Sequence, residues 1–341
     1  MFKTYCIYTI IPVYNQIGLI DDTMSSILAQ TYPQKELRVL FVDNCSEDGS
    51  YEKILQYVKD YPQLVSVYRM SNRTKPARLL KQAIAYLRFS PVHFSMLLNP
   101  GDVIYPNFMA KVIELMHFRT EVTAVYTNVD IKRIDGEVEV QKAVFTDSCI
   151  IDKEYDNSLF FAAETGAKVQ VIYRGMVTTP TERLLNLEKR TDIHDWMSAS
   201  YPNINKVAYL TESLGCICEP PKRDVMFELM TKAYSLKSQF YMTETSANYI
   251  EQNKRDVSDM KAAYRRLAEN ALLYAVEEGR KGNNDLAEKC LIFSEMMDSD
   301  VVEAAAYQRL QNALQGKCSF EEVVELLKAD SVKPPRHSFI F

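Results

Sequence analysis

Glycine is scarce in this sequence, and that scarcity limits the nucleotide-binding loops that the chain can contain. Only 10 of the 341 residues are glycine, and no G-x-G-x-x-G run occurs. Such a run after a strand marks dinucleotide-binding sheets, because its glycines let the backbone approach a pyrophosphate. The sequence therefore excludes that loop. It also lacks a glycine-rich loop with a basic residue near its N-terminus.

Long apolar runs and a strong excess of one charge are missing too. No apolar run reaches the roughly 18 residues that a membrane-spanning helix requires. The formal net charge of -5 argues against general binding to nucleic acid or to an anionic membrane. Pro12 and Asn15 interrupt the apolar N-terminal run, and no small-residue cleavage site follows it. We therefore predict that Met1 to Val13 is a first strand and not a signal peptide.

Cysteine and histidine show no metal-binding spacing. The seven cysteines are scattered, and Cys216 and Cys218 stand too close together for the usual zinc pairing. The four histidines have no ligand-like spacing either. The favoured interpretation is a cytoplasmic protein with reduced thiols.

What the sequence does contain is an alternation of strands and helices, with 47% apolar residues to build a core. Apolar residues recur at helical spacing between short β-rich runs. This alternation predicts an α/β fold with a doubly wound, mostly parallel sheet. The predicted strands of this part are Tyr5–Val13, Leu37–Val42, Leu64–Arg69, His93–Leu98 and Val122–Tyr126.

Residues 128–175 are less regular. Asp135-Gly136 predicts a hairpin turn. Lys168 to Arg174 and Val207 to Cys218 read as late strands, and Pro180 to Lys189 as a short helix.

From about Arg223 onward, helical periodicity replaces the strands. One helical stripe is predicted to close at Gly279, and two more follow. We predict an α/β domain over 1–221, a helical domain over 222–332 and a tail over 333–341. The helical domain is read as a small bundle, with a single tetratricopeptide-like pair as the alternative. It would serve self-association into a homo-oligomer, or the docking of a partner or acceptor.

Four polar segments follow strands or open a helix in the first 106 residues. In a doubly wound sheet such segments converge on one edge, where ligands bind. They are Ile11-Pro12-Val13-Tyr14-Asn15, Val42-Asp43-Asn44 with the loop to Ser50, Lys75-Pro76-Ala77-Arg78, and Leu98-Asn99-Pro100-Gly101-Asp102.

Taken together and in this order, the four segments resemble the family 2 glycosyltransferases, which have the nucleotide-sugar-binding GT-A fold. The resemblance covers roughly residues 3–218, and the helical part lies outside it. It implies an inverting, hexosyltransferase-type enzyme that uses a nucleotide-sugar donor, most commonly UDP-linked. It also implies a glycan, lipid-linked or protein acceptor in bacterial surface polysaccharide or glycan synthesis. We expect such an enzyme in the cytoplasm, either free or peripheral at the inner face of the membrane.

The resemblance assigns donor-binding roles to particular residues of this chain. The first loop would cradle base and ribose, Tyr14 would stack on a uracil, Asp43 would bind base or ribose, and Arg78 would reach the nucleotide. Simpler readings remain open: Pro12 as a strand terminator, Asp43 as a loop cap and Arg78 as a solvated helix residue. The full set of expected donor-binding residues is Pro12, Val13, Tyr14, Asn15, Asp43, Asn44, Arg78, Asn99 and Gly101.

The diphosphate site departs from the family pattern. The family usually has Asp-x-Asp after the fourth strand, whereas this chain has Asn99-Pro100-Gly101-Asp102. Asp102 is the acid that remains and is the expected ligand of Mn²⁺ or Mg²⁺, with Asn99 offering a carbonyl oxygen. Because Mg²⁺ keeps several waters and takes phosphate oxygens, one protein carboxylate can suffice.

The acceptor hydroxyl needs a general base, and the family uses an acid at the start of a helix, often before a tryptophan. Asp195-Trp196 matches that pattern. Asp192 is the rival, three residues away on the same predicted helix face, with a helix N-cap as its simpler role. Two other hypotheses compete: a degenerate GT-A protein acting as a scaffold subunit, and, more weakly, a nucleotidyltransferase.

Overall fold

The computed structural model describes residues 5–74, 76–87, 90–133, 136–143, 145–152, 170–175, 206–219, 240 and 258–330. These residues fall into two compact units, described separately below. The first contains the described residues up to 219, and the second contains residue 240 and 258–330. No helix among the described residues is both long enough and apolar enough to cross a bilayer.

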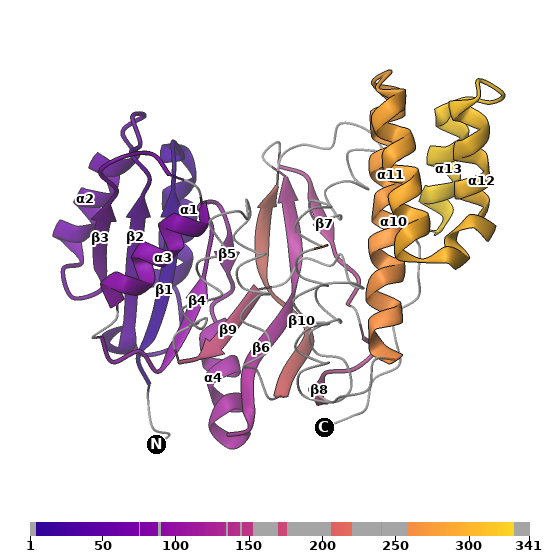
Figure 1. Cartoon of the computed structure of the whole chain (residues 1–341). Coiled ribbons are helices and arrows are strands. Elements are labelled where there is room, and N and C mark those ends of the chain that lie inside the picture. Colours follow the sequence, from indigo (N-terminus) through magenta and orange to yellow (C-terminus); the bar gives the residue numbers. More distant parts are fainter. Residues whose placement is uncertain are drawn as a thin grey trace. The chain divides into compact units, whose positions relative to one another are not determined.

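The first unit is an α/β structure around one mixed sheet (Figure 1). Its strands run in the order β3-β2-β1-β4-β9-β6-β10-β5, with β7 beside β6 and β8 beside β10. The strands are β1 (Ile7–Val13), β2 (Leu37–Asp43), β3 (Val65–Arg69), β4 (Phe94–Leu97), β5 (Val103–Ile104), β6 (Val122–Arg133), β7 (Val138–Val140), β8 (Cys149–Asp152), β9 (Gln170–Arg174) and β10 (Lys206–Glu219). The helices are α1 (Ile20–Leu28), α2 (Ser50–Asp60), α3 (Pro76–Leu87) and α4 (Phe108–Phe118), with short 3₁₀ turns at Ile17–Leu19 and Gln34–Glu36.

Parallel pairing dominates where the sequence predicted it. Strands β3, β2, β1 and β4 are all parallel, as are β6 and β10, while β9 is antiparallel to both β4 and β6. Because β9 is antiparallel to both of its neighbours, β6 runs in the same direction as β4. The C-terminal ends of β1, β2, β3, β4, β6 and β10 therefore lie along the same side of the sheet.

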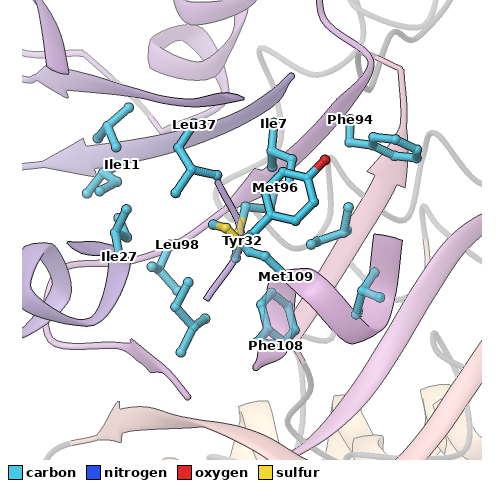
Figure 2. Close-up of a cluster of buried hydrophobic side chains, with 14 of the residues drawn as sticks. Ile7, Ile11, Ile27, Tyr32, Leu37, Phe94, Met96, Leu98, Phe108 and Met109 are labelled. Atoms are coloured by element: carbon cyan, nitrogen blue, oxygen red, sulfur yellow. The ribbon is translucent and has the colours of Figure 1, made fainter. Parts of the chain in front are cut away.

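The core forms because the central strands are apolar on both faces. Strand β2 is buried at every position except Arg38, as expected for a strand covered on two sides. One face receives the apolar sides of α1 and α4, whose buried residues recur every three or four positions. Figure 2 shows part of this cluster, with Phe108 and Met109 of α4 beside Met96 and Leu98.

Several sequence-based boundaries are refined by the structure. The predicted strand from Val122 extends to Arg133, and β6 pairs antiparallel with β7, the next strand along the chain. Asp135 of the predicted hairpin turn lies outside the described residues. Instead of several strands, 206–219 forms the single long strand β10, with register shifts between Leu210 and Cys216. The predicted α/β class with a mostly parallel sheet, followed by helices, is confirmed.

The second unit contains α10 (Ser258–Arg280), α11 (Asn284–Met297), α12 (Ala305–Leu314) and α13 (Phe320–Asp330), with a 3₁₀ turn at Ser299–Glu303. The predicted helix end at Gly279 is wrong by a short distance, because α10 runs on to Arg280 and Gly282 has the positive φ of +82° that ends it. Gly279 is glycine for another reason: a Cβ there would lie 2.2 Å from the Phe320 ring of α13. The sequence analysis did not predict α13.

Candidate functional site

The C-terminal ends of the parallel strands carry most of the residues singled out from the sequence. In the strand register, Val13 of β1 pairs with Asp43 of β2, and Asp43 pairs with Arg69 of β3. The ends of the three strands are therefore level. The Asn99–Asp102 turn follows β4, the neighbour of β1 on its other side. Asp43 and Asp102 thus lie at the same edge of the sheet, where ligands bind in open α/β folds.

The loops after β1 and β2 are tied to each other by backbone-to-side-chain hydrogen bonds. Asn15 donates its backbone N–H to Ser46 Oγ (3.0 Å), and its own Oδ1 accepts from the Glu47 N–H (2.9 Å). The Gln16 N–H donates to Ser50 Oγ (3.0 Å). Asn15 has a φ of +52°, a conformation that asparagine tolerates better than most residues. Asn15, predicted to bind the donor, here fixes the shape of the loop around Tyr14.

Asp43 is fully buried, and hydrogen bonds fix its carboxylate. The Ser46 N–H lies 3.2 and 3.3 Å from its two oxygens, and Arg69 Nε is 3.2 Å from Oδ2. This is the arrangement of the loop-capping role. A contact from Asp43 to a nucleotide base or ribose stays a prediction.

Arg69 is a residue of this site that the sequence analysis missed. Besides pairing with Asp43, its Nη2 donates to the Ser46 carbonyl (3.1 Å), and its guanidinium lies 4.2 Å from the centroid of the Tyr51 ring. Arg69 therefore holds both ends of the Asp43–Ser46 turn. The signal that could have revealed it is the strand register, which apolar patterning alone does not supply.

Arg69→Met is expected to destabilise the first unit by about 1–3 kcal/mol, because it leaves the buried Asp43 carboxylate without its cation. Arg69→Lys should recover part of that loss. The measurement is chemical unfolding of the three proteins.

The control is Arg119→Met. Arg119 pairs with Glu121 (2.9 Å). The Arg119 side chain is 42% exposed, close to the 39% of Arg69. Arg119 precedes β6, however, and therefore lies at the opposite edge of the sheet. Since exposed pairs contribute little, the control should change stability by less than about 1 kcal/mol. Equal effects of Arg69→Met and Arg119→Met would contradict the role given to Arg69.

The loop from β3 to α3 is pinned beside the same edge. The Asn44 side chain makes two hydrogen bonds to the Thr74 backbone, one to its carbonyl and one from its N–H, both 2.9 Å. The adjacent Arg73 guanidinium lies 4.2 Å from the centroid of the Tyr14 ring. One face of Tyr14 is therefore covered by a cation, and the predicted stacking on uracil would have to use the other face. Arg78 is exposed in the first turn of α3.

The Asn99–Asp102 turn is built from internal hydrogen bonds. Asp102 is 5% exposed, its Oδ1 accepts from the Cys218 N–H (2.9 Å), and its Oδ2 accepts from Asn99 N–H (3.2 Å) and Nδ2 (3.3 Å). Gly101 has a φ of +95° and donates to Thr23 Oγ1 (2.8 Å). Thr23 in turn donates to the Asp102 carbonyl (2.9 Å), so α1 holds the turn in place through this one side chain.

These contacts bear on the predicted metal site. The described residues contain no group of three His, Cys, Asp or Glu side chains that could hold a metal ion. Both oxygens of Asp102 already accept N–H groups, and Asn99 Nδ2 donates to the same carboxylate, which leaves Asn99 Oδ1 as a ligand oxygen. The described part of the site therefore does not form a ready ligand set for Mn²⁺ or Mg²⁺.

A second acid at this edge was also missed. Asp130, near the end of β6, accepts a hydrogen bond from Tyr105 Oη (2.7 Å). Burial, and then the Asp130 carboxylate, raise the pKa of Tyr105 above its ordinary value. Burial, followed by Asp130, raises the pKa of the Cys216 thiol to about 11, so this thiol stays protonated at neutral pH. Asp195 and Asp192, the predicted bases, lie outside the described residues.

Comparison with known proteins identifies what this arrangement is similar to. Residues 8–171 match the sequence model described as glycosyl transferase family 2. A poly(ribitol-phosphate) beta-glucosyltransferase of Bacillus spizizenii is 35% identical over 75 residues, which is 22% of this chain and 12% of that protein. The glycosyltransferase AglE of Haloferax volcanii is 42% identical over 55 residues, 16% of this chain and 18% of that protein. The chain thus matches only a small part of the length of these curated relatives.

Solved structures support the fold over nearly the whole chain. The structure of S. aureus TarS 1-349 aligns with a TM-score of 0.60 at 14% identity, covering 96% of this chain and 91% of that one. The same protein in complex with UDP-GlcNAc aligns with a TM-score of 0.58 at 16% identity and the same coverage. The expected GT-A fold, with a helical region after it, is therefore confirmed.

Proposed function

Residues 8–171 of the chain belong to glycosyl transferase family 2, and from this premise we propose that the protein transfers a sugar from a UDP-linked donor to a hydroxyl acceptor. The observation that carries the proposal is the placement of Tyr14, Asp43 and the Asn99–Asp102 turn at one edge of a parallel sheet. That edge is where an open α/β sheet binds a nucleotide.

The comparisons support the nature of donor and acceptor. A solved relative of the same fold was crystallised with UDP-GlcNAc, and a curated relative is named for glucosyl transfer to poly(ribitol phosphate). We propose a hydroxyl-rich surface polymer or glycan as the acceptor class. The Mn²⁺ or Mg²⁺ expected at Asp102 stays a prediction from the sequence, because the described residues do not assemble a ligand set.

The proposed reaction is a single in-line displacement with inversion. The acceptor oxygen attacks the anomeric carbon, the bond from that carbon to the diphosphate oxygen breaks, and the acceptor proton passes to the Asp195 carboxylate. UDP leaves with the bonding electron pair. The enzyme must therefore align donor and acceptor, accept one proton and stabilise the charge that develops on the diphosphate.

Incubation with a panel of UDP-sugars tests this proposal by the release of UDP. We expect release with one or a few of them, faster when a polyol-phosphate or glycan acceptor is added, in buffer with Mn²⁺. The absence of both binding and hydrolysis for every UDP-sugar would contradict it.

A second function is favoured by one specific observation: the remaining acid of the usual metal motif is buried in hydrogen bonds within its own turn. A degenerate GT-A protein could serve as a scaffold subunit whose helical unit binds a partner. Such a scaffold would keep its biological function in the Asp195→Ala variant, whereas a transferase would lose it.

A further inference from the structure

The donor diphosphate brings negative charge that the site must neutralise, and the Asn99–Asp102 turn is poorly suited to do this through a metal. Its single acid already accepts three hydrogen bonds, from the Cys218 N–H and from Asn99 N–H and Nδ2. A carboxylate engaged in this way stabilises the turn. It contributes a negative charge beside the place where a diphosphate would lie.

Positive charge is available from the loop between β3 and α3 and from the first turn of α3. Arg73 and Arg78 are both exposed, and within the described part of the chain neither has a carboxylate partner. The described contact of the Arg73 guanidinium is with the Tyr14 ring, 4.2 Å away. By contrast, Arg69 is committed to Asp43, and Arg133 pairs with Glu139.

Arg73 is held at the C-terminal edge of the sheet, and Arg78 stands in the first turn of α3. Thr74, next to Arg73, is fixed to Asn44 by two hydrogen bonds of 2.9 Å. Tyr14 directly follows β1, so its stacking with Arg73 places that guanidinium beside the loop that would hold the base. An arginine presents its donors in a planar fork that suits phosphate oxygens, and it keeps its charge at all working pH values.

Resting on the proposed function, we propose that Arg73, together with Arg78, binds the diphosphate of the donor and takes the place of the metal. During transfer, the bond from the anomeric carbon to the diphosphate oxygen breaks, and the oxygen leaves with the electron pair. The two guanidinium groups stabilise the charge on that leaving group. The proton released by the acceptor goes to the base, so the arginines exchange no proton.

Equilibrium binding of uridine, UMP and UDP tests this inference in two buffers, one with EDTA and one with Mn²⁺. For the wild-type chain, UDP should bind more tightly than uridine by a factor that changes less than about threefold between the buffers. Arg73→Gln should weaken UDP by about tenfold or more, as expected for loss of charge-assisted hydrogen bonds, and leave uridine unchanged. Arg119→Gln, which removes an arginine at the opposite edge, should change neither ligand.

The outcomes separate this inference from the function on which it rests. If the preference for UDP over uridine disappears in EDTA, or if Arg73→Gln binds UDP like the wild type, the inference is wrong and the transferase proposal stands. If Arg73→Gln weakens uridine as much as UDP, Arg73 supports the base site through Tyr14 and the inference is likewise wrong. If none of the three ligands binds the wild type, both proposals fall.

Discussion

Replacing Asp195 with asparagine is expected to lower kcat by about 10²–10⁴-fold, the range over which a positioned general base contributes to catalysis. Asparagine keeps the size of the side chain but does not accept the proton of the acceptor hydroxyl. Because Asp195 is assigned to the acceptor side, the affinity for UDP should stay within about twofold of the wild-type value. The measurements are initial rates with saturating donor and equilibrium binding of UDP to the same preparation.

The matched control is Asp192→Asn. Asp192 stands three residues earlier in the predicted helix, where a cap is its simpler role. Because asparagine caps a helix about as well as aspartate does, the substitution should leave stability nearly unchanged and leave most of kcat. If Asp192→Asn abolishes turnover and Asp195→Asn does not, the two assignments must be exchanged. If both variants turn over at the wild-type rate, neither residue is the base.

Gly101→Ala is expected to destabilise the first unit by about 2–5 kcal/mol and to lower transferase activity with it. Two costs add at this position. The φ of +95° strains any residue with a Cβ, and the new Cβ would lie 2.9 Å from Cys218 Cβ. Cys218 Cβ is attached directly to the backbone of β10, so it does not move aside freely. Chemical unfolding measures the total.

Gly136→Ala separates the two costs. Gly136 has the same φ of +95°, but a Cβ there has nothing within 4 Å. This control should cost only the strain, about 1–2 kcal/mol. Adding Cys218→Gly to Gly101→Ala should reduce the excess cost of Gly101→Ala over Gly136→Ala. If the two alanine variants are equally stable, the contact between Gly101 and Cys218 is not what requires glycine.

The alternation of strands and helices could be predicted from the sequence because it depends on local patterns. Strand β2 is apolar at nearly every position, and α4 buries Phe108, Met109, Val112, Ile113 and Met116 along one side. Both patterns appear within a dozen residues and depend little on the rest of the fold. The positions of Asp43 and of the Asn99–Asp102 turn, at strand ends, followed from the same patterns.

The contacts that determine what each site residue does are long-range, and the sequence alone did not supply them. Asp102 accepts from the Cys218 N–H, 116 residues away in the chain, and this bond forms where β5 pairs with β10, with Val103 opposite Cys216. The pairing of Arg69 with Asp43 depends on the register between β2 and β3. The sequence therefore did not reveal the hydrogen bonds that hold Asp102 in its turn, and it did not reveal Arg69 as the cation beside Asp43.

The helical unit shows the same contrast between local patterns, which the sequence reveals, and long-range packing, which it does not. Its first three helices follow from apolar stripes, whereas Gly279 was misread as a terminator because its purpose is contact with Phe320 of another helix. Glycine in a helix can mark an end or a close approach, and only the packing distinguishes them.

A crystal soaked with UDP tests the central claim most directly. We expect the uracil beside Tyr14 and the Asp43–Ser46 turn, with the diphosphate directed toward Arg73 and Arg78. A nucleotide bound away from the C-terminal ends of β1, β2 and β4, with those loops unchanged, would contradict the donor site and the sugar transfer derived from it.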